Sequence, residues 1–347
     1  MRRLLLPLAG AALLIGGWLS LDPPAASHAA PRTSKNVSPR QVAVGTATAA
    51  RRAPAADLPG DVVLRAPWGG GPGELGRRAA NESSPEGPMS FAVAKNGRAY
   101  VLDQVNSRVS VFDGGSAVRT LPLPADTFQD IAVREDGGVA LLDRYGAESV
   151  AFLSTEGRLT HEVPLAGDGV PSGGDVTALF QHEDGTWVEV QHGSLVRIAD
   201  AQGNALDERN VIPGRLMADG SAIRMSKSGA SAAWLAVTPP GERARALTRV
   251  EFELPVLQLL GLETDATGRI VIAADLAEES PEPPFALLDA RETIVVLSRD
   301  GAELERFELP AATGGEESLR RVRLGPDGAI HHMSFSESGV TVRKVSR

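Results

Sequence analysis

The chain repeats a short pattern in which apolar runs alternate with turn residues. Residues 92–103 read AVAKNGRAYVLD and residues 132–143 read AVREDGGVALLD, with five of the twelve positions identical. In both copies two apolar runs flank an Asn-Gly or Asp-Gly pair, which is typical of a β-hairpin. No stretch after residue 60 carries an apolar stripe at helical spacing over three turns, so we expect an all-β protein.

Each repeat has room for four strands. In 88–124 the runs SFAVAK, AYVLD, VSVFD and AVRTLPL are separated by turns or short loops. Four antiparallel strands in about 40 residues make one blade of a β-propeller. The pattern recurs, with increasing divergence, in 88–124, 130–165, 175–211, 215–255, 259–310 and 320–345. We therefore predict a six-bladed β-propeller.

The last copy ends after its third strand, whereas a spare apolar run, DVVLRAP, precedes the first copy. A blade that lacked its fourth strand would leave the backbone groups of an edge unpaired. We therefore predict that residues 62–65 pair with residues 340–345, so that the N-terminal strand completes the last blade and closes the ring.

The first copy resembles a known repeat. Residues 88–113 fit P-x-x-x-A-V-x-x-x-G-x-x-Y-V-x-D-x-x-x-x-R-V-x-V-F-D and follow a glycine-rich run, WGGGPGELG, and both features resemble the NHL repeat. The resemblance implies a six-bladed propeller, in agreement with the strand count. It implies no single activity, because NHL-like rings bind proteins or RNA and related six-bladed rings include metal-dependent lactonases and lyases.

Composition narrows the range of partners. The chain has 347 residues, of which 42% are hydrophobic, and a formal net charge of −9. An acidic chain without a basic run is poorly suited to nucleic acid or to an anionic membrane. There is no cysteine, so the core must hold the fold without disulfides. Frequent Arg, Ala and Gly suggest a bacterial source.

The N-terminus resembles an export signal. Two arginines precede the apolar run of residues 4–21, and Ser27-His28-Ala29 offers small residues to a signal peptidase. We expect a signal peptide over 1–29, a disordered linker over 30–59 and the propeller over 60–347. The protein would then be periplasmic or secreted. The alternative is an uncleaved segment that anchors it in the inner membrane.

Three aspartates follow the second strands of their repeats, namely Asp103, Asp143 and Asp275. They form either a partial carboxylate ring for Ca²⁺ or another divalent cation, or a set of turn caps in which Asp103 pairs with Arg108. Glu263 and Asp265 are further carboxylates in the fifth copy.

The longest insertion, residues 275–292, is acidic and rich in proline. It is either a solvated loop or a contact for a partner. We expect a binding face that combines it with the ends of the second strands. The candidate residues of this face are Asp103, Asn106, Arg108, Asp143, Arg144, Asp275, Glu278, Glu279 and Glu282.

No catalytic constellation stands out, and the histidines beyond residue 29 have no metal-ligand spacing. We treat all five as structural or surface residues: His161, His182, His192, His331 and His332. Our hypothesis is an exported, monomeric, non-catalytic binding or scaffold propeller without a cofactor, which recognises a protein or another envelope or extracellular ligand at its channel mouth. The alternative is a metal-dependent propeller enzyme of the lactonase, hydrolase or lyase type, with the cation on Asp103, Asp143 and Asp275.

Overall fold

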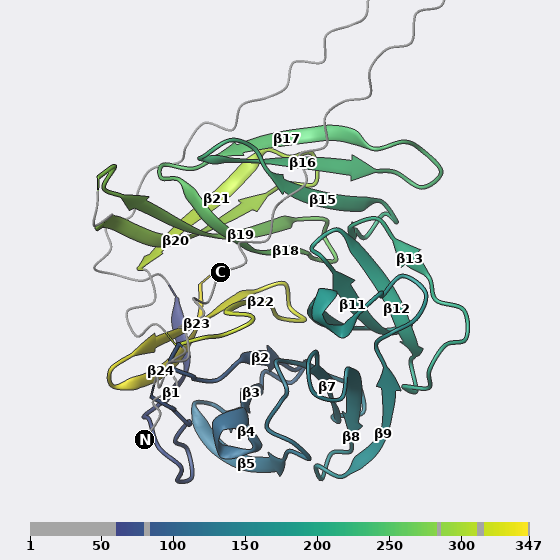
Figure 1. Ribbon diagram of the computed structural model, residues 1–347, viewed down its shortest axis with the longest axis vertical. Helices are drawn as coiled ribbons and strands as arrows, with labels where there is room; N and C mark the ends of the chain where they lie inside the picture. Colours follow the sequence, from purple (N-terminus) through teal and green to yellow (C-terminus); the bar gives the residue numbers. More distant parts are fainter. Residues whose placement is uncertain (1–59, 80–83, 283–285, 311–315, 346–347) are drawn as a thin grey trace, which may run out of the picture. The chain divides into compact units, whose positions relative to one another are not determined.

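The computed structural model describes residues 60–79, 84–282, 286–310 and 316–345. These residues form strands β1 to β24 and two short 3-10 turns, η1 (Gln104–Asn106) and η2 (Gly173–Asp175). The strands make six four-stranded sheets around a centre (Figure 1), which confirms the predicted all-β, six-bladed propeller. No helix of the described residues is long and apolar enough to cross a membrane. The expected signal peptide and linker, 1–29 and 30–59, lie outside the described residues.

The six sheets are the blades, numbered here in chain order. Blade 1 contains β2 (Ser90–Val93), β3 (Ala99–Asp103), β4 (Arg108–Asp113) and β5 (Ser116–Pro122). Blade 2 contains β6 (Asp130–Val133), β7 (Val139–Asp143), β8 (Ser149–Leu153) and β9 (Leu159–Pro164). Blade 3 contains β10 (Val176–His182), β11 (Gly185–Val190), β12 (Ser194–Asp200) and β13 (Val211–Ile212).

The second half of the ring follows the same order. Blade 4 contains β14 (Arg215–Leu216), β15 (Ala222–Lys227), β16 (Ala232–Thr238) and β17 (Arg245–Glu251). Blade 5 contains β18 (Val256–Thr264), β19 (Ile270–Glu279), β20 (Leu287–Leu297) and β21 (Glu303–Pro310). Blade 6 contains β22 (Val322–Leu324), β23 (Ile330–Ser336), β24 (Gly339–Lys344) and, from the N-terminal side, β1 (Asp61–Ala66).

The pairing of β1 with β24 closes the ring. The two strands are antiparallel, with Leu64 opposite Val342 and Ala66 opposite Val340. The predicted closure by the N-terminal strand is therefore confirmed. Leu64 is 1% exposed and packs in the cluster between blades 6 and 1, so the closing strand contributes core as well as hydrogen bonds.

Local turn chemistry accounts for the hairpins that the sequence repeats. Gly97 and Gly137 have φ angles of 80° and 82°, in the left-handed region that glycine enters without steric cost. These turns join the first strand of a blade to its second. The end of the ring that carries them is called the turn face below, and the end at which the second strands finish is called the opposite face.

The hydrophobic core lies between neighbouring blades. Phe91 and Phe112 of blade 1 pack with Met333 and Phe335 of blade 6, and Phe152 of blade 2 packs against blade 3. The second strands of blades 1 and 2 are buried at every position, because sheets stacked on both sides leave neither face to water. The first strands are left to line the centre of the ring.

Candidate ligand-binding cavity at the turn face

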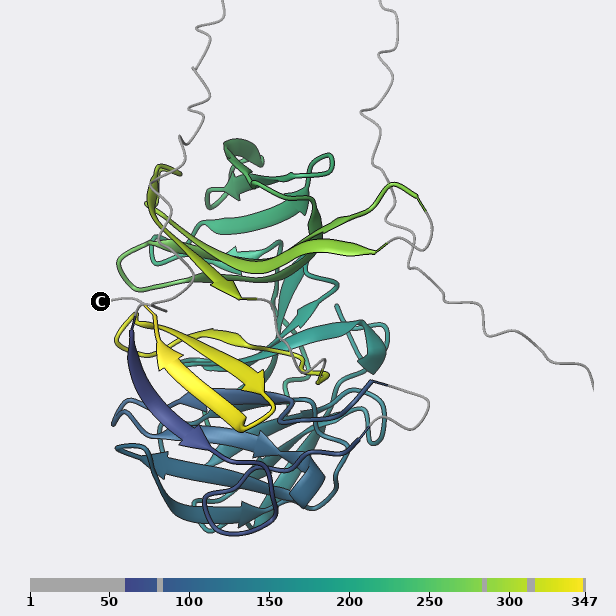
Figure 2. The same ribbon diagram turned by 90° about the vertical axis from the view of Figure 1, so that its left-hand side faces the viewer.

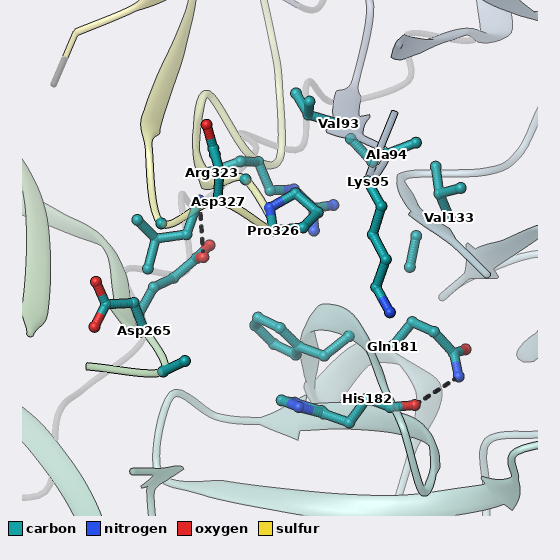
Figure 3. Close-up of a pocket in the computed structure, with 18 of the residues that line it drawn as sticks. Val93, Ala94, Lys95, Val133, Gln181, His182, Asp265, Arg323, Pro326 and Asp327 are labelled. Atoms are coloured by element: carbon teal, nitrogen blue, oxygen red, sulfur yellow. Dashed lines mark hydrogen bonds between the residues drawn. The ribbon is translucent and has the colours of Figure 1, made fainter. Parts of the chain in front are cut away.

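A cavity of about 810 Å³ occupies the centre of the turn face. All six blades contribute to its wall through the last residues of their first strands and the turns that follow, for example Val93, Val133, His182, Leu216, Glu263 and Leu324. Figure 3 shows Lys95 and Arg323 pointing into this space, and Gln181 and His182 lining another side of it. A volume of this size is typical of a small-molecule site.

The floor of the cavity is built on the ring of Phe180. The guanidinium carbon of Arg215 lies 3.7 Å from the ring centroid, and that of Arg320 lies 4.4 Å from it. Two cations therefore contact one aromatic ring. Each contact is electrostatically favourable because the π face is negative, more so where water is excluded.

Asp130 is fully buried and pairs with Arg320 and Arg323. Its carboxylate accepts hydrogen bonds from the Ser90 hydroxyl at 2.6 Å, from the backbone N–H of Leu179 at 2.8 Å, and from Arg323. Burial alone would disfavour the charged form, but Arg323 and Arg320 outweigh it and hold the pKa of Asp130 below its ordinary value. The group is therefore an ionised anchor for the two arginines.

Two further carboxylates complete the network. Glu263 pairs with Arg320 and accepts the backbone N–H of Leu324 at 3.0 Å. Glu189 lies 3.1 Å from Arg215, and despite burial this arginine helps to lower the pKa of Glu189 to about 2. The arginines are thus neutralised inside the protein.

The network crosses the ring. Its members come from blade 1 (Ser90), blade 2 (Asp130), blade 3 (Phe180, Glu189), blade 4 (Arg215), blade 5 (Glu263) and blade 6 (Arg323). Burial lowers the pKa of Arg323 to about 10, a value at which it is still charged at neutral pH. Breaking a buried ion pair is costly, so these pairs hold the floor in place.

The segment before β22 closes the channel behind the floor. The backbone N–H of Leu319 donates to the carbonyl of Met89 in the lead-in to blade 1 at 2.8 Å. Its side chain packs against the cluster between blades 2 and 3. Arg320 follows directly and reaches Asp130 and Glu263. The cavity is therefore closed at its inner end.

His182 is the most available polar group of the wall. Its ring lies 6.3 Å from that of Phe180 and 6.2 Å from that of Trp187. It is exposed to the cavity, and within the described part of the chain its ring nitrogens have no hydrogen-bond partner. The surrounding protein lowers the pKa of His182 by desolvation, so the ring is neutral at pH 7 and can both donate and accept.

The rim of the cavity carries charged pairs in contact with water. The ammonium group of Lys95 lies 2.5 Å from the carboxylate of Glu135, and this hydrogen bond raises the pKa of Lys95. Asp265 pairs with Arg269 at 2.6 Å, and its side chain is only 5% exposed. The exposed pair of Lys95 and Glu135 contributes little to stability, so these two residues are free to exchange each other for a ligand.

The aspartates singled out from the sequence lie on the opposite face. Asp103 accepts hydrogen bonds from Gly76 N–H at 2.8 Å and from the side chains of Asn106 and Arg108 at 2.9 Å each. Arg108 also donates to the carbonyls of Gly70, Gly71 and Glu74. Asp103 and Arg108 therefore fasten the glycine-rich lead-in to blade 1.

Asp143 and Asp275 have separate local partners. Asp143 accepts the N–H groups of Gly146 and Ala147 at 2.7 and 3.0 Å, as a turn cap does. Both carboxylate oxygens of Asp275 lie 2.9 Å from Arg321 of the next blade. The structure does not bring the three aspartates together, and among residues 60–345, apart from the gaps given above, no three His, Asp or Glu side chains form a group suited to a metal ion.

Of the other residues predicted for the binding face, Arg144 has local partners and the three glutamates are exposed. Arg144 is held by the carbonyl of Gly174 at 2.8 Å and lies over the ring of Tyr145. Glu278, Glu279 and Glu282 are exposed on a projection of blade 5. The insertion of 275–292, expected as a loop, is mostly strand, because β19 continues to Glu279 and β20 begins at Leu287.

The cavity at the turn face was not predicted from the sequence, and His182 was expected to be a structural or surface residue. One signal was present. Asp130, Arg215 and Arg323 are charged residues in strands that the ring must bury, and a buried charge requires a partner. Which partner each one meets depends on the closure of the ring, since Asp130 and Arg323 are 193 positions apart.

The fold and cavity define a six-bladed β-propeller with a central pocket that opens at the turn face. No family model and no curated protein matches the sequence. Several solved structures are similar to the chain at low identity and low TM-score. A streptogramin B lyase is 13% identical, with a TM-score of 0.42 over 76% of this chain and 95% of that one. The calcium-binding protein regucalcin from Agrobacterium tumefaciens is 14% identical, with a TM-score of 0.47 over 83% and 94%.

A third structure, virginiamycin B lyase from Staphylococcus aureus, is 12% identical, with a TM-score of 0.41 over 77% of this chain and 96% of that one. At these identities the likeness concerns the fold alone. The function must therefore be argued from the cavity itself.

Proposed function

We propose that this protein is a non-catalytic binding propeller that holds a small ligand in the cavity of the turn face. The observation that carries the proposal is a preformed pocket, closed at its inner end, with a floor fixed by ion pairs that cross the ring. A rigid pocket loses little entropy on binding, which favours affinity. The NHL-like first repeat fits such a role, because rings of that kind serve as binding platforms.

The charges of the wall favour a ligand without a large net charge. The lining contains five cations and five carboxylates: Lys95, Arg134, Arg215, Arg269 and Arg323, and Glu135, Glu183, Glu263, Asp265 and Asp327. Alanine, valine and leucine side chains lie between them, and His182 adds a neutral hydrogen-bonding ring. A compound with apolar surface and several hydrogen-bonding groups suits this lining best.

A purely binding role agrees with the state of the floor. Asp130 and Glu263 each accept hydrogen bonds from arginines and from backbone N–H groups. The lowered pKa of Asp130, caused by Arg323 and Arg320 despite burial, makes this carboxylate a weak base. The floor is therefore suited to holding a ligand in place.

A ligand screen tests this proposal. Thermal unfolding of the protein would be measured with amino acids, sugars, nucleosides and short peptides, and each hit would be incubated and analysed for products. Leu216→Trp places bulk in the cavity, whereas Leu304→Trp places it at an exposed position of β21 outside the cavity. We expect hits to stabilise the protein and the Leu304→Trp variant but not Leu216→Trp. Stabilisation that survives Leu216→Trp, or turnover of a hit, would reject the proposal.

We also propose that the protein acts outside the cytoplasm as a monomer, in the periplasm or the medium. The support is the signal-like segment 1–29 and the lack of a basic run suited to nucleic acid. Expression in a bacterial host followed by N-terminal sequencing tests the location. We expect Ala30 as the first residue, and a membrane-bound product that retains Met1 would instead favour the anchor.

A further inference from the structure

Blade 5 carries a two-stranded projection on the opposite face. The outer strands of this blade, β18 and β21, end before its two middle strands do. The last pair of β18 with β19 joins Val256 to Leu276, and the last pair of β21 with β20 joins Pro310 to Arg291. The two middle strands continue, with Glu278 opposite Asp289 and Glu279 opposite Leu287. Residues 277–282 and 286–290 are called the arm below. Figure 2 shows β19 and β20 reaching out beyond the rest of the ring.

The arm presents exposed apolar side chains. Leu287 and Leu288 are 62% and 61% exposed, and they lie at a bulge where Leu287 pairs with Glu279 and Asp289 pairs with Glu278. Leu257, 69% exposed, lies on β18 at the base of the arm. A two-stranded ribbon without a covered face gains little stability on its own. Burial against a partner would remove these leucines from water.

The arm is also strongly acidic. Glu278, Glu279 and Glu282 are exposed, and no cation of the described residues pairs with them. Arg291 at the base of the arm is already shared among Glu253, Asp289 and Glu308. The free charge of the arm is therefore negative.

The base of the arm is held in a fixed position. Asp275 and Glu292 face each other on β19 and β20, and the guanidinium of Arg321 from blade 6 contacts both. His332 lies 3.3 Å from the same Glu292 carboxylate. One cation thus clamps both strands where they leave the ring, so the arm is presented in a defined orientation.

We propose that the arm docks a partner protein through an extended segment in which apolar residues are flanked by Lys or Arg. The leucines would be buried and the three glutamates would pair with the basic residues, which gives both affinity and orientation. A second copy of this chain is a poor occupant, because a two-fold contact would bring one acidic arm against another. This site is independent of the cavity, which lies on the other face.

Defined peptides test the proposal with the chain that follows residue 29. The probes are Lys-Val-Lys-Leu-Lys-Val, its Glu-for-Lys counterpart and Lys-Ser-Lys-Ser-Lys-Ser, each with a fluorophore, and binding is followed by anisotropy at low and high salt. We expect binding of the first peptide, weaker at high salt, and no measurable binding of the other two. Leu287→Ser with Leu288→Ser, or Gln at all three glutamates, should weaken it about tenfold or more.

The controls are Leu304→Ser and Glu162→Gln, which alter an exposed leucine and an exposed glutamate away from both the arm and the cavity and should leave binding unchanged. Circular dichroism would confirm that every variant is folded. Equal binding by all variants would mean non-specific attraction to an acidic protein and would overturn the proposal, as would no binding at all. Dimerisation that the leucine changes abolish would also overturn it, in favour of a second copy.

Discussion

Arg323, on the first strand of the last blade, donates a hydrogen bond to Asp130, on the first strand of the second. The two residues are 193 positions apart and both are buried. Their pairing joins the two blades on either side of blade 1 at the floor of the cavity. The charge pair thus connects the closure of the fold with the shape of the proposed binding site.

The first prediction concerns the loss of this anchor. Asp130→Asn keeps the size of the side chain but leaves Arg323 and Arg320 with one carboxylate fewer in a buried site. Removal of one partner from a buried ion pair costs about 3–5 kcal/mol, and we expect a loss of that order in the free energy of unfolding, measured with urea. Asp136→Asn, which alters a 61% exposed side chain beside Arg134, should change it by less than about 0.5 kcal/mol. A similar small effect for both variants would show that Asp130 does not support the floor.

The second prediction concerns acid stability. The pKa of Glu189 is lowered to about 2 from an ordinary value of 4.5. A lowered carboxyl pKa stabilises the folded state above the ordinary value, and this contribution disappears as the pH falls from about 4.5 towards 2. Its size is about 3 kcal/mol at neutral pH. Urea unfolding measured between pH 6 and pH 2 should therefore show a falling stability that is less steep in Glu189→Gln. As a comparison, Glu135→Gln removes an exposed rim carboxylate and should leave the slope unchanged.

Features that depend on residues close together in the sequence or on the number of strands could be predicted, whereas side-chain contacts between distant residues could not. Asn96-Gly97 and Asp136-Gly137 specify their turns locally, and the spare run around Leu64 pointed to ring closure because the last repeat lacked a strand. The floor of the cavity was not predictable in this way. Asp130 meets Arg323 only after six divergent blades have closed, and no local pattern encodes that meeting.

The candidate site lies on the other face from the predicted one for the same reason. Asp103 and Asp143 are conspicuous in the repeats because they follow a strand, but this position is used to cap turns and hold the lead-in. The residues of the cavity lie at the ends of the first strands and in the turns that follow, where the repeats carry different side chains, for example Lys95, His182 and Asp265. His182 has no motif around it, and its exposure to the cavity follows from the packing of blade 3 against its neighbours.

The third prediction concerns the protonation of His182. Its pKa lies below 6.5 because the cavity wall removes water from the charged form. Long-range ¹H–¹⁵N correlation spectra recorded against pH should therefore give a midpoint below 6.5. Asp184 opposes this shift, so Asp184→Asn should lower the midpoint further. A midpoint above 6.5 in the unaltered protein would mean that the cavity wall does not desolvate the ring.

The last prediction concerns the clamp at the base of the arm. Arg321→Leu leaves Asp275 and the buried Glu292 facing each other with only His332 nearby. Two ionised carboxylates in this position repel, so we expect a loss of about 3 kcal/mol or more at pH 7. The loss should shrink at pH 5, because burial already raises the pKa of Asp275 and its protonation removes the repulsion. Hydrogen exchange should also become faster in residues 277–290. Arg299→Leu, in which a 59% exposed arginine is replaced, should show neither effect, and equal behaviour of the two variants would mean that Arg321 does not hold the arm.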